Sequence, residues 1–361
     1  MPDHAVPWPD PQRHAAFLNW LAPLLQRHAL VPESLRPASA DASFRRYLRL
    51  DSADGSSRII MDAPPPQEDV RPFLQVAALI EAAGLHAPRV LEADPNAGFL
   101  LLQDLGSRLY LDALREASAQ EADRLMRGVI DALVQWQQRV DATTLPPYDE
   151  ALLQRELALF PEWCVEREFG VAWNDAQRNG WQQVCRLLVD SALAQPQVAV
   201  HRDWMPRNLM IAEPGPGILD FQDAVRGPIS YDLASLLRDA FWSWDEEREL
   251  DWAVRYWEKA RAAGLLPPGG DSGSDSGSAL GDDFGSFWRA LEWMGLQRHL
   301  KVLGIFCRLK HRDAKPKYAE DLPRFFGYAI GVARRYRELA PLLPLLEPLA
   351  GTTSVIAYSL R

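Results

Sequence analysis

One segment of the chain combines residue types and spacing that could transfer a phosphoryl group. Residues 201–208 read HRDWMPRN, so that four residues separate Asp203 from Asn208. A second acid, Asp220, follows the short run Gly-Ile-Leu at 217–219. The first spacing matches the H-R-D-x-x-x-x-N loop of phosphoryl-transfer enzymes, and Asp220 lies where their second metal-binding acid follows. The alternative is an ordinary polar turn between two strands, in which Asp and Asn are common.

The chemistry of phosphoryl transfer explains why these residue types would be needed. ATP reaches such an enzyme as its magnesium complex, and Mg²⁺ prefers hard oxygen ligands. The side-chain oxygen of Asn208 and the carboxylate of Asp220 can supply them. Asp203 can orient an acceptor hydroxyl and accept its proton during attack on the γ-phosphate. We expect His201 to support the loop structurally, and Asp232 to do the same from the start of a helix.

Composition indicates a folded protein with two domains or lobes. The chain has 361 residues, of which 47% are hydrophobic and 24% charged, values typical of soluble globular proteins. The net charge of −10 argues against a general nucleic-acid binder, which is typically basic, and we expect no nucleic-acid partner. Three scattered cysteines favour a reducing compartment over a disulfide framework or zinc site.

No apolar stretch reaches the roughly 18 residues that a membrane span needs. The first ten residues hold prolines and acids and no signal-peptide core. The sequence therefore predicts a cytoplasmic protein without a membrane partner.

The elements that must position these residues differ between the two parts of the chain, the first mixed in strands and helices and the second mainly helical. The first hundred residues alternate strand and helix signals, with a hairpin turn expected at Asp54-Gly55. Strands are predicted at 44–50, 58–62, 89–92 and 98–102, and helices at 14–30 and 70–83. This pattern favours a small α+β lobe at 1–104.

The chain beyond residue 104 is mainly helical. Helices are predicted at 149–160, 176–194, 231–244, 245–263, 284–300 and 322–340. Two short strands, 198–200 and 217–220, interrupt them on either side of the HRDWMPRN segment. We assign 105–361 to a second lobe that carries the catalytic loop and acceptor site. Its Gly/Ser/Asp-rich stretch, 266–283, is predicted to be a flexible surface insertion.

Longer stretches around these residues resemble a known family. The loop, the DFQD turn at 220–223 and the GPISYDLA stretch at 227–234 are similar to the aminoglycoside phosphotransferase-like kinases. The resemblance covers roughly residues 41–328. It implies an α+β, bilobal protein-kinase-like fold, with a small β-rich N-terminal lobe and a larger helical C-terminal lobe. It also implies ATP and Mg²⁺ as cofactors and a small-molecule acceptor.

Within that family the resemblance is sharper to one group of sugar kinases. Segments 41–47, 61–65, 201–210 and 300–306 resemble kinases that phosphorylate the anomeric C1 hydroxyl of N-acetylmuramate and N-acetylglucosamine. The resemblance implies an amino sugar as acceptor and a sugar 1-phosphate product that feeds UDP-sugar synthesis in peptidoglycan recycling.

The nucleotide site departs from the protein-kinase pattern. There is no G-x-G-x-x-G loop and no V-A-I-K lysine; Met61 stands near the expected lysine position. Candidates for the replacing cation are the arginines of the 44–50 strand: Arg45, Arg46 and Arg49. A solvated strand face is the equally open alternative for each of them. By analogy with the kinase hinge, backbone groups of Gln103 and Leu105 are expected to bind adenine.

Candidates for the acceptor site come from two regions. Trp204 follows Asp203 directly and could contact the sugar, while Asp223 could bind a hydroxyl, assist the metal or cap the turn. The segment 298–317 holds seven Arg or Lys and one acid, and a solvated helix surface would explain most of them. Its residues Arg308 and His299 are our candidates for holding the lactyl carboxylate of N-acetylmuramate.

Two other functions remain open at this point. A kinase of another small-molecule hydroxyl, such as an aminoglycoside, choline, homoserine or a thiosugar, would use the same loop. A pseudokinase-like binding protein would explain the missing lysine and glycines, although it would not need the complete set of Asp203, Asn208 and Asp220.

Overall fold

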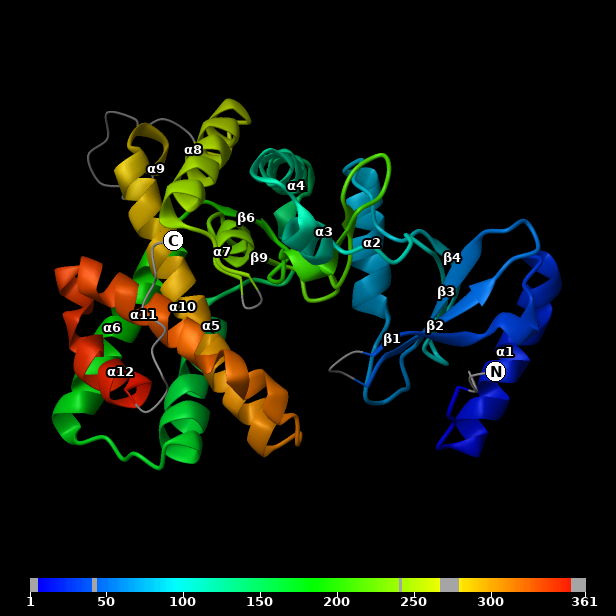
Figure 1. The fold of residues 1–361 in the computed structure, drawn as a ribbon, viewed down its shortest axis with the longest axis horizontal. Helices are drawn as coiled ribbons and strands as arrows, with labels where there is room; N and C mark the ends of the chain where they lie inside the picture. Colours follow the sequence, from blue (N-terminus) through cyan, green and yellow to red (C-terminus); the bar gives the residue numbers. More distant parts are fainter. Residues whose placement is uncertain (1–5, 41–43, 240–241, 267–278, 352–361) are drawn as a thin grey trace. The chain divides into compact units, whose positions relative to one another are not determined.

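The computed structural model describes residues 6–40, 44–239, 242–266 and 279–351 (Figure 1). Two compact units divide the chain, and neither is one continuous stretch of sequence. The first unit comprises Met1–Arg115 and Arg207–Asp223, and the second comprises Glu116–Pro206 and Ala224–Arg361. Most of the predicted insertion, at 267–278, lies outside the described residues.

The first unit is built on a five-stranded antiparallel sheet with the order β1-β2-β3-β5-β4. Its strands are β1 (Arg36–Ala40), β2 (Arg46–Asp51), β3 (Ser57–Asp62), β4 (Val90–Asp94) and β5 (Phe99–Gln103). The turn between β2 and β3 contains Gly55 at a φ of +82°, a left-handed conformation that glycine adopts without strain. The predicted hairpin is therefore confirmed.

Helix α1 (Pro11–Arg27) packs against one face of this sheet. Asp10 caps its first turn and Pro11 begins it, which moves the observed start three residues ahead of the predicted one. Its buried side chains meet inward-facing residues of the sheet in a single core: Phe17, Leu21, Leu24, Leu48, Leu50, Ile60, Phe99 and Leu101. Burying each large apolar side chain contributes about 1.5–3 kcal/mol to the free energy of unfolding.

Helix α2 (Arg71–Ala82) is the second helix of the unit, and it matches the prediction. It ends before Gly84, which has a φ of +72°. Its buried Phe73 contacts Phe221 with ring centroids 4.5 Å apart. This contact joins α2 to the residue that follows Asp220.

Both predicted short strands exist, and each pairs with a strand that was not predicted. In the first unit, β8 (Gly217–Ile218) pairs with β7 (Leu209–Met210). In the second unit, β6 (Gln197–Val200) pairs with β9 (Val225–Pro228). The Gly-Pro dipeptide at 227–228 normally indicates a turn, and for this reason β9 was not predicted from the sequence.

The second unit is mainly helical. Its larger helices are α4 (Ala119–Arg139), α5 (Glu150–Leu159), α6 (Asp175–Leu193), α7 (Tyr231–Leu237), α8 (Glu246–Ala262), α10 (Phe284–His311), α11 (Leu322–Arg335) and α12 (Leu343–Ala350). A short helix, α9 (Ala279–Asp282), precedes α10, whereas α3 (Tyr110–Glu116) belongs to the first unit except for its last residue. The predicted helices at 149–160, 176–194 and 245–263 are confirmed, and that at 322–340 ends early, at Arg335.

Two further predicted helix lengths were wrong. Helix α7 ends at Leu237 instead of 244, because Arg238 leaves the helical conformation and pairs with Glu249 and Glu292. Helix α10 runs to His311 instead of 300. In its basic second half, Lys301 pairs with Glu156 and Lys310 pairs with Glu168, both acids of the same unit.

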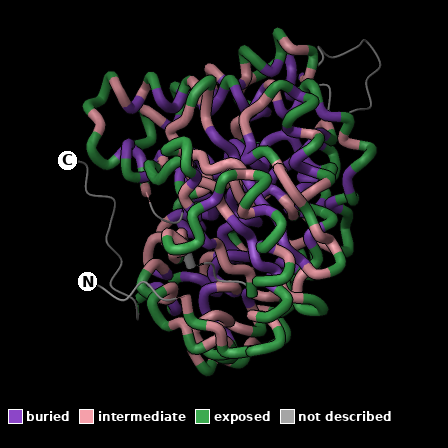
Figure 2. Tube along the Cα trace, turned by 90° about the vertical axis from the view of Figure 1, so that its right-hand side faces the viewer, coloured by how far each residue is buried: buried purple, intermediate pink, exposed green. Residues whose placement is uncertain are grey.

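Helix α10 is the central element of the second unit. It is 28 residues long, and most of its residues are buried; buried positions are purple in Figure 2. A Cβ added at Gly304 would lie 2.4 Å from the backbone of Leu159, so α10 and α5 approach closely there. No described helix is both long and apolar enough to cross a membrane.

Candidate functional site

The HRDWMPRN loop follows β6 and has an unusual backbone. Arg202 has a φ of +77°, a left-handed conformation that costs a non-glycine residue about 1–2 kcal/mol. The carboxylate of Asp232, on α7, accepts the backbone N–H of His201 at 2.7 Å and that of Arg202 at 2.9 Å. Asp232 thereby holds the backbone next to Asp203.

Asp232 performs this role in a fully buried environment. Burial raises its pKa to about 7, although the two backbone N–H groups and the nearby Arg298 guanidinium favour the charged form. The local field at the loop therefore depends on a buried carboxyl that titrates near neutrality.

A buried ion network holds the side chain of Arg202. Its Nη2 lies 2.5 Å from Oε1 of Glu156, on α5, and Nζ of Lys301, on α10, lies 2.9 Å from the same oxygen. Tyr148 donates its hydroxyl to Glu156 as well. Burial opposes ionisation of Glu156, but Lys301 and Arg202 outweigh it and lower its pKa to about 2. Glu156 and Lys301 were not among the predicted site residues.

Asp203 is accessible, with 42% of its side chain exposed, and its Oδ1 lies 3.7 Å from Nη2 of Arg298. Trp204, the next residue, is fully buried and packs edge-on against His201, with ring centroids 5.5 Å apart. The indole of Trp204 is thus placed in the core of the second unit.

The two candidates for the sugar carboxylate lie apart from each other along α10. His299 is fully buried and stacks on Tyr328 at 4.8 Å. Burial, more than the nearby positive charges of Arg238 and Arg298, lowers the pKa of His299 well below its usual value. The imidazole ring is therefore neutral. Arg308 is partly exposed, and burial lowers its pKa. The α10 residue that the structure brings to Asp203 is Arg298.

The predicted metal ligands lie together in the first unit. Asp220 has a φ of +60°, and its carboxylate accepts Nδ2 of Asn208 at 3.5 Å and Nε2 of Gln222 at 2.9 Å. Nη2 of Arg45 lies 3.8 Å from Oδ1 of Asp220. Gln222 also contacts Asp223 at 3.4 Å. Asn208 and Asp220 are thus in contact, and Arg45, which precedes β2 and does not lie on the strand as predicted, is beside them.

This donor set fits Mg²⁺. Asn208 and Asp220 offer hard oxygens, and the Asp220 side chain is 38% exposed. Among the residues that the structure describes, there is no cluster of three or more His, Cys, Asp or Glu that could enclose a metal. A site with two protein ligands suits Mg²⁺, which takes its remaining ligands from phosphates and water.

The other two candidate arginines lie on β2 and are paired elsewhere. Arg46 forms an ion pair with Asp62, which also pairs with Arg13. Nε of Arg49 lies 2.6 Å from Oδ2 of Asp104. Of the three candidates for the missing lysine, Arg45 is therefore the one that lies beside Asp220.

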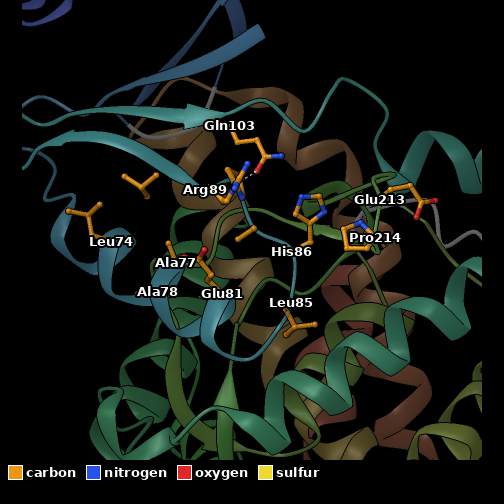
Figure 3. A pocket seen from close by; sticks show the side chains of 13 residues that line it. Leu74, Ala77, Ala78, Glu81, Leu85, His86, Arg89, Gln103, Glu213 and Pro214 are labelled. Atoms are coloured by element: carbon orange, nitrogen blue, oxygen red, sulfur yellow. Dashed lines mark hydrogen bonds between the residues drawn. The ribbon is translucent and has the colours of Figure 1, made fainter. Parts of the chain in front are cut away.

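A pocket of about 430 Å³ lies within the first unit (Figure 3). It is formed by α2, the 85–90 segment, the end of β5 and the β7–β8 turn. The side chain of Gln103 reaches it and accepts a hydrogen bond from Nε of Arg89 at 3.2 Å. Leu105 lies near Gly217, where an added Cβ would be 2.6 Å from its Cδ1. The pocket lining does not include the cluster around Asp220.

Solved structures and a family model define the class of the protein. Residues 34–268 match the model described as the phosphotransferase enzyme family. An ADP-bound aminoglycoside phosphotransferase has a TM-score of 0.58 at 13% identity, covering 90% of this chain and 99% of that one. A choline kinase from Streptococcus pneumoniae has the same TM-score and coverage at 12% identity. The predicted α+β, bilobal protein-kinase-like fold is confirmed.

Closer relatives refine this assignment. N-acetylmuramate/N-acetylglucosamine kinases from Pseudomonas aeruginosa and Neisseria meningitidis are 51% and 47% identical to the chain. The first covers 88% of this chain and 89% of the relative, and the second 94% and 97%. The chain belongs to the phosphotransferase enzyme family and, within it, to the N-acetylmuramate/N-acetylglucosamine kinases. The predicted resemblance is confirmed.

Proposed function

We propose that the protein transfers the γ-phosphoryl group of ATP to the anomeric C1 hydroxyl of N-acetylmuramate and N-acetylglucosamine. The observation that carries this proposal is the identity of 47–51% to kinases named for both sugars, over most of each chain. The presence of Asp203, Asn208 and Asp220 in one short span of sequence supports it. The product is the sugar 1-phosphate.

In this reaction Asp203 orients the C1 hydroxyl and accepts its proton. The sugar oxygen forms a bond to the γ-phosphorus, the bond between that phosphorus and the bridging oxygen breaks, and ADP leaves. An anomeric hydroxyl is more acidic than a simple alcohol, so a carboxylate is a sufficient base. The 42% exposure of Asp203 leaves the side chain open to a substrate.

The metal and phosphate contacts are assigned to residues of the first unit. Asn208 and Asp220 would hold Mg²⁺, which would neutralise charge on the β- and γ-phosphates. Arg45, 3.8 Å from Asp220, is assigned to the phosphates in place of the missing lysine. Backbone groups of Gln103 and Leu105 are assigned to adenine. Trp204 and Asp223 are kept as acceptor-side candidates, although the side chain of Trp204 is fully buried.

A kinase that draws on ATP and supplies UDP-sugar synthesis belongs in the cytoplasm, and we propose that location. The product would feed peptidoglycan recycling.

The test is ATP-dependent phosphorylation of a small acceptor panel, read by phosphorus NMR. The panel holds N-acetylmuramate, N-acetylglucosamine, glucosamine, kanamycin and choline, with and without Mg²⁺. A sugar 1-phosphate signal from the N-acetylated sugars is expected. Product from another acceptor alone would replace the substrate assignment and keep the reaction class. Magnesium-dependent nucleotide binding without turnover on any acceptor would favour a pseudokinase-like binding protein.

A further inference from the structure

Arg298 occupies an unusual position behind Asp203. It lies on α10, its side chain is only 3% exposed, and its Nη2 is 3.7 Å from Oδ1 of Asp203. Its Nη1 is buried and has no hydrogen-bond partner among the residues that the structure describes. Burial raises the pKa of Asp232, which holds the loop backbone, and the positive charge of Arg298 partly opposes that rise. One guanidinium thus serves two carboxylates of the loop region.

Burial of the Arg298 guanidinium with incomplete pairing is unfavourable for the free energy of folding. Removing a guanidinium from water has a large free-energy cost, and attraction to carboxylates offsets this cost only when they are well placed. The distance of 3.7 Å between Nη2 of Arg298 and Oδ1 of Asp203 is long for an ion pair, and none of the described residues accepts a hydrogen bond from Nη1. Apolar residues of similar volume that replace a buried ion pair often leave a protein equally or more stable. The arrangement therefore favours a role in the chemistry of Asp203 over a role in stability.

We propose that Arg298 is a positioning residue for Asp203. From the buried side, it attracts one carboxylate oxygen and directs the other toward the exposed side, where the acceptor hydroxyl arrives. This inference rests on the proposed function, in which Asp203 accepts the proton of that hydroxyl. The planar, permanently charged guanidinium suits the task, because it can restrain both the position and the tilt of a carboxylate.

The alternative role for Arg298 is to bind the lactyl carboxylate of N-acetylmuramate. N-acetylglucosamine lacks that group, so the two roles predict different outcomes. A positioning residue affects both sugars equally, since both present the same C1 hydroxyl. A carboxylate-binding residue affects N-acetylmuramate alone. The burial of Arg298 and its two carboxylate neighbours favour the positioning role.

The experiment compares Arg298→Met, Arg298→Lys and Arg298→Ala with the wild-type protein. Arg289→Met is the matched control: Arg289 lies on the same helix but forms a half-exposed ion pair with Glu338. We expect kcat to fall at least about 100-fold in Arg298→Met on both sugars, with KM for ATP within about threefold. Arg298→Lys should recover part of the loss, and added guanidinium ion should partly restore Arg298→Ala. Arg289→Met should keep full activity.

Several outcomes would overturn the inference. Loss confined to N-acetylmuramate would show that Arg298 binds the sugar carboxylate. Unchanged kcat in Arg298→Met, or loss without rescue by lysine or guanidinium in proteins that melt normally, would exclude positioning. Wild-type turnover of the two sugars tests the proposed function separately. The ratio of variant to wild-type rates, measured also for slow ATP hydrolysis without acceptor, tests Arg298 even if neither sugar reacts.

Discussion

Arg202 and Glu156 form an ion pair of 2.5 Å that ties helix α5 to the residue immediately before Asp203. The same Arg202 has a left-handed backbone, and Asp232 accepts its N–H. The backbone and side chain of one residue are therefore held by two acids from separate helices. Through Arg202, α5 and α7 determine where the chain presents Asp203.

Replacing Glu156 by Gln should reveal this restraint as a pH-dependent loss of stability. The variant leaves Lys301 and Arg202 without their shared anion, and we expect its free energy of unfolding at neutral pH to fall by about 3 kcal/mol. The pKa of Glu156 is lowered in the folded state to about 2. Its contribution is therefore fully present above its unfolded pKa and is lost as pH falls from there toward about 2.

Urea unfolding of wild type and Glu156→Gln at neutral pH and at about pH 4 and 3 measures the difference. The gap between the two proteins should narrow as the pH falls. Glu150→Gln is the matched control, since Glu150 lies exposed at the start of the same helix. A gap that stays constant over the acid range would contradict the assignment of the ion network.

Arg202→Gly and Arg202→Ala should differ in stability although both lose the ion pair. The left-handed backbone at 202 strains alanine but not glycine. We expect the glycine variant to be the more stable by about 1 kcal/mol. Urea unfolding at one pH is sufficient for the comparison. An alanine variant at least as stable as the glycine variant would mean that the loop does not keep this conformation once the side chain is gone.

Asp220→Asn should weaken the response to magnesium without disturbing the backbone. Asparagine tolerates the φ of +60° but lacks the charge of a carboxylate. We expect turnover to fall by about 100-fold or more and half-maximal activity to need at least about tenfold more Mg²⁺. A magnesium titration at saturating ATP measures both. Glu33→Gln, an exposed acid of the 3₁₀ turn Pro32–Ser34 in the first unit, is the control, and an equal response from it would remove the metal role from Asp220.

Asp203→Asn should separate chemistry from nucleotide binding. Asparagine keeps the shape of the side chain but cannot accept the proton of the hydroxyl, and we expect kcat to fall about 10³-fold. ATP affinity, measured by calorimetry, should stay within about threefold. The wild-type protein with the same ligands is the reference. Turnover within tenfold of it would mean that another group serves as the base.

Parts of the fold were predictable because their signals are local. The β2–β3 hairpin follows from Asp54-Gly55, and the end of α2 follows from Gly84, since both glycines have positive φ. The early end of α7 was not predictable, because it depends on Arg238 pairing with two acids from α8 and α10. No local pattern around Arg238 indicates those partners.

The residues of the candidate site also fall into those that local sequence signals predict and those that depend on tertiary packing. The spacing of Asp203, Asn208 and Asp220 predicts a catalytic loop, and the structure places Nδ2 of Asn208 3.5 Å from the carboxylate of Asp220. Glu156 and Arg298 could not be distinguished from ordinary helical charges, because their roles arise from burial beside the loop. The basic segment 298–317 did contain Arg298, yet periodicity alone could not say which of its side chains point inward.

Helix α10 carries its buried charges, Arg298 and Lys301, among apolar neighbours, and this affects the order of assembly. Neither charge can leave water at low cost until α5 and the 201–203 segment supply Glu156 and Asp203. Partners for this one helix come from positions about 100–150 residues earlier in the chain. Docking of α10 should therefore be a late, rate-limiting event in refolding, and the helical unit should gain its final packing in one cooperative step.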